Sequence, residues 1–145
     1  MSKDTIESRV ALALEKHSKG YNCAQSVSCA FSDLTDLDEK TIFRMTEGLG
    51  LGMGGMDGTC GAISAAAVLS GIKLSTCNLE APDSKKISYN TSKTCIDTFK
   101  QLNGSVVCRE LKGVDTGTPL RPCNECIADA VRIIGEHLFH DAKSL

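Results

Sequence analysis

Apolar residues recur at helical spacing along almost the whole chain, and this periodicity limits the possible folds more than any other feature. Near the end of the sequence, the apolar residues are spaced by four, three and four positions: Ile127, Val131, Ile134 and Leu138. Such spacing places side chains on one face of a helix. The longest strand-like stretch is Ser105-Val106-Val107, which is too short for a sheet. The sequence therefore predicts an all-α fold.

Capping residues and glycines set the expected helix boundaries. The spacing of Asp4 and Glu7 fits a capping box, Asn22 precedes the second helix, and Asp36 and Glu39 frame the third. The expected helices cover residues 4–20, 22–34, 36–49, 59–72, 86–102, 105–111 and 123–139. No repeat, low-complexity tract or linker divides them. We therefore expect a single-domain bundle of about five to seven helices over residues 1–145, with a glycine-rich loop before the central helix.

Seven glycines fall within residues 48–61, and part of this cluster, Gly50-Leu51-Gly52-Met53-Gly54-Gly55, matches the pattern GxGxxG. A dinucleotide-binding motif needs a strand before these glycines and a helix directly after them. Here the preceding segment is helical and the next helix starts several residues late. We interpret the cluster instead as backbone that packs closely around Cys60, with Gly58 and Gly61 as candidates to bind a cofactor or offer N–H groups to sulfur.

Cysteine is the compositional outlier, with eight residues in 145. The first residues lack the apolar core of a secretory signal, and no apolar run reaches the ~20 residues of a membrane span. A net charge of -2 and 4% aromatic residues do not favour nucleic-acid binding. We therefore expect a cytoplasmic protein without membrane insertion, whose cysteines are catalytic, redox-active or metal-binding instead of structural disulfides.

Four of the eight cysteines are expected at helix N-termini, where free N–H groups and the helix dipole stabilise a thiolate. These four are Cys23, Cys60, Cys108 and Cys123. Their expected capping or first-turn neighbours are, in order, Asn22, Asp57 or Thr59, Ser105, and Pro122. The competing interpretation is that each cysteine is a small buried apolar residue.

Residues 123–126 form a CxxC motif, and His137 and His140 follow at a spacing that superficially suits a zinc finger. On one continuous helix, however, Cys126 and His137 would be roughly 16 Å apart, because each residue adds about 1.5 Å. They cannot share a zinc ion with bonds of ~2.0–2.3 Å. We therefore expect these two histidines and His17 at the surface or the edge of the core.

Three segments give the chain a family resemblance. They read Cys23-Ala24-Gln25-Ser26-Val27, Gly58-Thr59-Cys60-Gly61-Ala62 and Cys108-Arg109-Glu110-Leu111. With them the chain resembles the C_GCAxxG_C_C family from about residue 22 to residue 134. The resemblance implies redox activity based on four signature cysteines. They match Cys23, Cys60, Cys108 and, better than Cys126, Cys123. One departure is Ala65, which stands where the CGAxxG motif has its second glycine.

Three functions remain open. The four cysteines could cycle between thiol and disulfide, or exchange electrons with an unknown redox partner. They could instead form a Cys₄ iron-sulfur or zinc site, or simply pack within an interaction module. Four convergent thiolates would repel one another, so they should be protonated, paired or bound to metal. We expect Cys23, Cys60, Cys108 and Cys123 to converge; the sequence assigns no role to Cys29, Cys77, Cys95 and Cys126.

The positions of Cys23 and Cys29 in one helix give a first prediction. Cys23 lies at the helix start, whereas Cys29 lies six residues later, away from the free N–H groups. We expect Cys23→Ser to abolish the redox or metal signal and Cys29→Ser to leave it nearly intact. Thiol titration and metal analysis of both variants test this. Equal loss in both, at unchanged helical content by circular dichroism, would contradict it.

Overall fold

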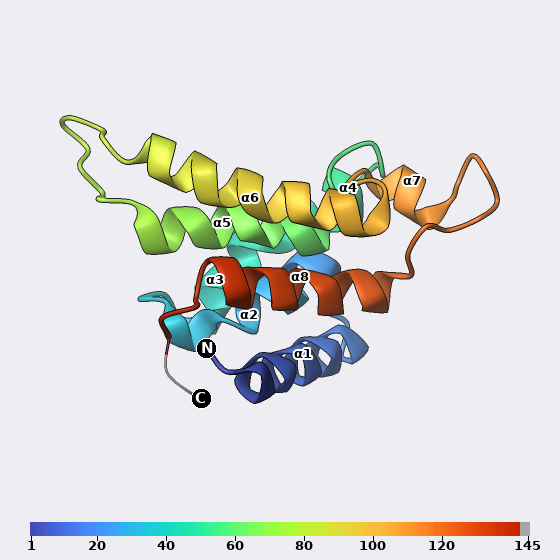
Figure 1. The fold of residues 1–145 in the computed structure, drawn as a ribbon, viewed down its shortest axis with the longest axis horizontal. Helices are drawn as coiled ribbons and strands as arrows, with labels where there is room; N and C mark the ends of the chain where they lie inside the picture. Colours follow the sequence, from blue (N-terminus) through green and yellow to red (C-terminus); the bar gives the residue numbers. More distant parts are fainter. Residues whose placement is uncertain (143–145) are drawn as a thin grey trace.

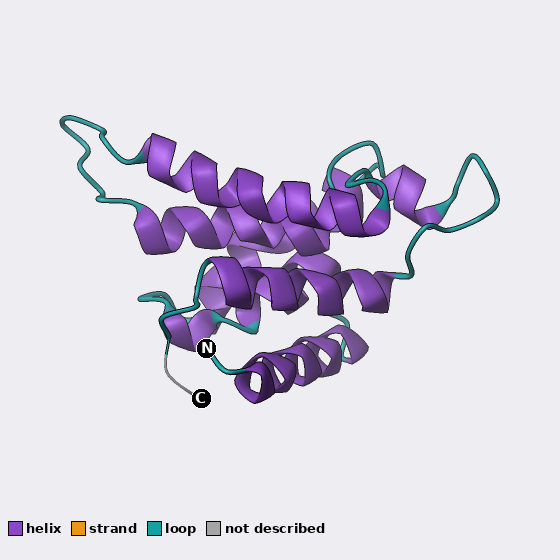
Figure 2. Ribbon diagram, in the orientation of Figure 1, coloured by secondary structure: helices purple, strands orange, loops and turns teal. Residues whose placement is uncertain are grey.

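The computed structural model describes residues 1–142, which form α-helices and short 3₁₀ turns joined by loops (Figure 2). The helices are α1 (Lys3–Ser18), α2 (Cys23–Cys29), α3 (Glu39–Thr46), α4 (Gly50–Met53), α5 (Gly61–Leu74), α6 (Lys85–Asn103), α7 (Cys108–Lys112) and α8 (Cys123–His137). The 3₁₀ turns are η1 (Ser32–Leu34) and η2 (Glu47–Leu49). No strand occurs in this part of the chain, so the predicted all-α fold is confirmed.

The α4 segment is a turn with left-handed backbone, not a true helix. Leu51 has φ 55° and ψ 41°, and Gly52 has φ 56° and ψ 52°. Without it, the described residues contain seven helices, the upper end of the predicted number. The glycine-rich segment lies before α5, as expected.

Helix α5 lies at the centre of the bundle and packs against α2, α6 and α8, while α1 packs on the opposite side of α8 (Figure 1). Small residues make this central position possible. The side chains of Ala62, Ala65 and Ala66 are fully buried and let neighbouring helices approach closely. The N-terminal ends of α5 and α8 point toward the same end of the bundle, where α4 and α7 also lie (Figure 1).

Several predicted helix starts need correction. The cap of α1 is Ser2, whose Oγ accepts a hydrogen bond from the Thr5 N–H, and not the Asp4–Glu7 box. The cap of α3 is Asp38 instead of Asp36. Both errors have one cause, since polar side chains clustered before a helix offer several caps of nearly equal strength.

The second predicted helix is shorter than expected. The capping box of Asn22 and Gln25 is present, but α2 ends at Cys29 and is followed by η1. The helix is also buried on nearly all sides, so Cys29 is only 1% exposed although it lies on a different face from the apolar residues that follow Cys23 at helical spacing. Periodicity indicates which face is apolar but not how many neighbours cover a short helix.

No helix within residues 1–142 is both long and apolar enough to span a membrane.

A buried arginine connects α1 to the segment after α2. The side chain of Arg9 is fully buried and donates to both carboxylate oxygens of Asp33, at 2.7 and 2.9 Å. It also donates to the Ala30 carbonyl at 2.8 Å and lies over the Phe31 ring. Phe31 in turn stacks on Phe139 with ring centroids 5.0 Å apart. The ion pair therefore packs against one side of the stacked Phe31 and Phe139 rings.

We expect Asp33→Ala to lower the free energy of unfolding by about 2–3 kcal/mol, because the Arg9 charge would remain buried without its partner. The expected loss of stability is smaller than the loss on breaking a fully buried ion pair, because Asp33 is half exposed. Urea denaturation measures it, and Asp36→Ala on the exposed surface nearby is the control. Arg9 also holds the pKa of Asp33 below its usual range. The stabilisation is therefore present at neutral pH and lost as the pH falls through that lowered pKa. Equal stability of the two variants would contradict this account.

Candidate functional site

Five cysteines line one cavity of about 300 Å³ at the end of the bundle where α2, α5, α7 and α8 begin. They are Cys23, Cys60, Cys108, Cys123 and Cys126. The structure thus brings together the four cysteines that the sequence singled out and adds a fifth. The other lining residues are His17, Asn22, Leu51, Gly61, Leu111, Lys112 and Arg121.

The four predicted cysteines occupy helix starts. Cys23, Cys108 and Cys123 are the first residues of α2, α7 and α8, and Cys60 is itself the N-cap of α5. The expected caps Asp57 or Thr59 are therefore wrong. So is Ser105, because Val107 is the N-cap of α7. The expectation that the four sulfurs lie beside free helix N–H groups nevertheless agrees with these positions.

A short pairing of extended backbone fixes Cys60 beside Cys108. Thr59 and Val107 form an isolated antiparallel bridge. The Cys60 N–H donates to the Val106 carbonyl at 2.6 Å, and the Cys108 N–H donates to the Gly58 carbonyl at 3.0 Å. These bonds hold the starts of α5 and α7 side by side. Gly58 therefore positions Cys108 through its backbone, and it is not among the residues that line the cavity.

Two glycines allow backbone to approach this cavity closely. A Cβ at Gly52 would lie 2.5 Å from the Cys108 Cβ, so only glycine leaves room for that cysteine. A Cβ at Gly61 would lie 3.1 Å from the Leu49 carbonyl oxygen and 3.2 Å from the Ala24 nitrogen. The glycine segment thus packs against Cys108 and α2 more than around Cys60.

Cys23 and Cys123 are two half-buried cysteines that interact with each other in the cavity. The neighbouring Cys23 thiol stabilises the Cys123 thiolate and lowers the pKa of Cys123 to about 5. The ammonium group of Lys112 adds to the effect, since its Nζ donates to the Cys123 sulfur at 3.4 Å. The same interaction with Cys123, together with burial, raises the pKa of Cys23. At neutral pH the pair therefore consists of a Cys123 thiolate and a Cys23 thiol.

Cys60 and Cys126 form a second, more deeply buried pair. Their exposed fractions are 7% and 2%. The Cys126 thiol donates to the Arg121 carbonyl at 3.7 Å. The neighbouring Cys126 side chain, followed by the backbone N–H groups of Ala62 and Ile63, lowers the pKa of Cys60. The same interaction with Cys60, together with burial, raises the pKa of Cys126. In place of the glycine N–H groups that we expected, N–H groups in the first turn of α5 contribute to the lowered pKa of Cys60.

The fifth cavity cysteine, Cys108, lies beside both pairs. Burial and then the negative charge of Cys60 raise its pKa, which favours the protonated thiol. The cavity thus combines the Cys123 thiolate and its Cys23 thiol with a second pair in which the pKa of Cys60 is lowered and that of Cys126 is raised, and with the neutral thiol of Cys108.

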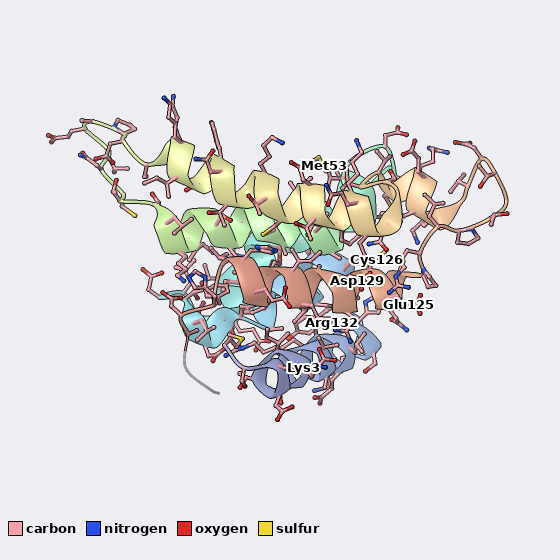
Figure 3. All side chains as sticks on the ribbon, in the orientation of Figure 1. Lys3, Met53, Glu125, Cys126, Asp129 and Arg132 are labelled. Carbon is pink, nitrogen blue, oxygen red and sulfur yellow. The ribbon has the colours of Figure 1, made fainter. Side chains whose placement is uncertain are left out.

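Three site residues were not identified from the sequence. Cys126 lies one helical turn after Cys123 near the start of α8 (Figure 3), so the CxxC spacing was the available signal. Lys112, at the end of α7, gave no local signal because only the fold brings it to Cys123. His17 is half-buried, which agrees with the expected place at the edge of the core, but its position in the cavity lining was not expected.

The other three cysteines lie outside the cavity lining. Cys29 and Cys95 are buried, which raises the pKa of each to about 11. Cys77 is exposed in the loop between α5 and α6. All eight cysteines are free thiols in the structure.

The alternative of a Cys₄ metal site is not supported by the geometry of the described residues. Within residues 1–142, no group of three or more histidine, cysteine, aspartate or glutamate side chains is arranged to hold a metal ion.

The fold and the site define an all-α, cysteine-rich protein with a thiol-lined cavity. A family model described as "Putative redox-active protein (C_GCAxxG_C_C)" matches residues 21–137. The chain therefore belongs to this family, as its cysteine motifs indicated. Comparison with curated proteins and with solved structures gave no match.

The low pKa of Cys123 predicts how its reactivity depends on pH. We expect alkylation of Cys123 by iodoacetamide to increase through about pH 5, because its thiolate is populated above that pH. Lys112→Met should move the increase to higher pH by removing a positive charge. Mass spectrometry of digested protein measures each site, with the exposed Cys77 as internal reference. A Cys123 profile that rises only near the ordinary thiol pKa of ~8.5 would contradict the assignment.

Proposed function

We propose that this protein is a thiol/disulfide redox protein in which Cys123 is the nucleophile and Cys23 is its partner. The observation that carries this proposal is the polarised Cys23–Cys123 pair in a cavity, with Lys112 bonded to the thiolate. A thiolate attacks disulfides, whereas a protonated thiol does not. Both sulfurs are half-buried and therefore more accessible than Cys60 and Cys126.

The reaction proceeds in two exchange steps. The Cys123 thiolate attacks one sulfur of a substrate disulfide, forming a mixed disulfide and releasing the first substrate thiolate, which takes the proton of Cys23. The Cys23 thiolate then attacks the Cys123 sulfur and releases the second substrate thiolate. The substrate disulfide is reduced by two electrons, and the protein gains one Cys23–Cys123 disulfide.

The buried pair supplies a second dithiol. The Cys60 thiolate can attack the Cys23–Cys123 disulfide and form a mixed disulfide with one of these two cysteines. Cys126 then attacks the Cys60 sulfur of the mixed disulfide, so that a Cys60–Cys126 disulfide remains and the outer cysteine is released. This transfer restores the outer dithiol and gives the cavity a capacity of four electrons. Cys108 is the neutral thiol beside both pairs. Return to the fully reduced state requires a dithiol redox partner, and we propose that the protein works in the cytoplasm, where thiols are kept reduced.

Anaerobic purification followed by thiol counting tests the proposal. We expect eight titratable thiols, no stoichiometric metal, and loss of two thiols on treatment with one equivalent of diamide. Peptide mapping of samples quenched with acid at successive times should identify the first bond as Cys23–Cys123 and the later one as Cys60–Cys126.

The matched variants are Cys123→Ser, which removes this bond, and Cys95→Ser, a buried cysteine outside the cavity that should leave it unchanged. If the purified protein contained stoichiometric iron with sulfide, or stoichiometric zinc, this result would contradict our proposal and support the metal-binding alternative. Eight thiols that resist diamide would instead favour cysteines that only pack.

A further inference from the structure

The cavity lining contains basic but not acidic side chains, although the chain as a whole carries a net charge of -2. Three basic residues line it, namely His17, Lys112 and Arg121. Among the residues that the structure describes, no aspartate or glutamate belongs to this lining. The excess of basic over acidic side chains is therefore a local property of the site.

The three basic side chains do not contribute equally to the charge of the cavity. Arg121 is already neutralised, because its guanidinium binds Asp129 at 2.9 and 3.2 Å and lies 3.3 Å from Glu125. The carboxyl groups of Glu125 and Asp129 belong to the first two turns of α8, beside the cavity lining (Figure 3). Lys112 has the Cys123 sulfur as its partner, 3.4 Å away. Lys112 therefore determines the positive charge that the sulfurs experience.

The proposed reaction removes the charge that balances Lys112. In the reduced protein, the ammonium group faces a thiolate. When the Cys123 sulfur enters a mixed disulfide it becomes neutral, and until Cys23 has lost its proton the half-buried ammonium group has no thiolate beside it. An anionic group on the substrate restores the balance, whereas a cationic group adds repulsion.

We infer that the cavity selects small anionic disulfides, whose negative group pairs with Lys112 while Cys123 is covalently bound to substrate. This inference rests on the proposed thiol/disulfide function. A volume of about 300 Å³ lies at the lower end of small-molecule sites, which favours a low-molecular-weight substrate over a folded protein.

Three small disulfides with arms of equal length differ in their charge, so comparing them separates the effect of substrate charge from the effect of substrate size. Bis(2-sulfonatoethyl) disulfide is a dianion, bis(2-hydroxyethyl) disulfide is neutral, and cystamine is a dication. Release of the corresponding thiol by the reduced full-length protein is followed for each. Every rate is divided by the rate of the same disulfide with free dithiothreitol, which corrects for intrinsic reactivity. We expect the normalised rates to fall about tenfold from the anion to the neutral compound and again to the cation, and the differences to shrink as salt is added.

Lys112 variants distinguish charge selection from activation of the nucleophile. Lys112→Met should slow all three disulfides, because the pKa of Cys123 rises, and should also reduce the anion-to-cation ratio to a few-fold. Lys112→Arg keeps the charge and should retain most of the ratio. Lys93→Met, on the exposed face of α6, is the control that should change neither the rates nor the ratio.

Equal normalised rates in the unmodified protein, or an unchanged ratio in Lys112→Met, would overturn the inference and leave the thiol/disulfide function intact. Failure of all three disulfides to react would overturn the proposed function itself. Circular dichroism of each variant excludes unfolding as the cause of a lost ratio.

Discussion

The meeting of four helix N-termini at one cavity is the constraint on which the rest of this structure depends. Each helix start presents unpaired N–H groups and a partial positive charge, approaching half a unit charge in a long helix, so bringing four together is unfavourable unless negative charge lies between them. Sulfur supplies that charge here. The Cys123 thiolate, together with Cys60, whose pKa is also lowered, offsets the converging dipoles, while the neighbouring thiols prevent the repulsion that four thiolates would produce. Structural stability and nucleophilicity thus have the same electrostatic origin.

This arrangement explains which parts of the site were predictable. A helix start is a local property, so capping patterns and Pro122 were enough to place Cys23, Cys60, Cys108 and Cys123 at N-termini, even where the capping residue itself was misassigned. The all-α fold followed from periodicity for the same reason. Cys126 was passed over because the family pattern has four signature cysteines and this chain brings five together.

The remaining features depend on contacts between distant segments, which no local pattern encodes. Lys112 reaches Cys123 only because α7 and α8 start at the same cavity. Arg9 and Asp33 are separated by 24 residues, and neither stands out in its own segment. The sequence likewise did not reveal that the five sulfurs would segregate into a half-buried pair, a deeply buried pair and a single thiol. That division follows from side-chain packing after the helices assemble.

The left-handed α4 turn has a consequence for protein design. Leu51 and Met53 both adopt positive φ, which disfavours side chains other than glycine, and Gly52 between them fits against Cys108 with no space for a methyl group. If only the five cysteines were transferred to an idealised helical bundle, the design would therefore lack the α4 turn, which forms part of the cavity around them. The smallest portable unit includes residues 50–61 together with residues 106–109, because the backbone bonds between these two segments hold the turn in its unusual conformation.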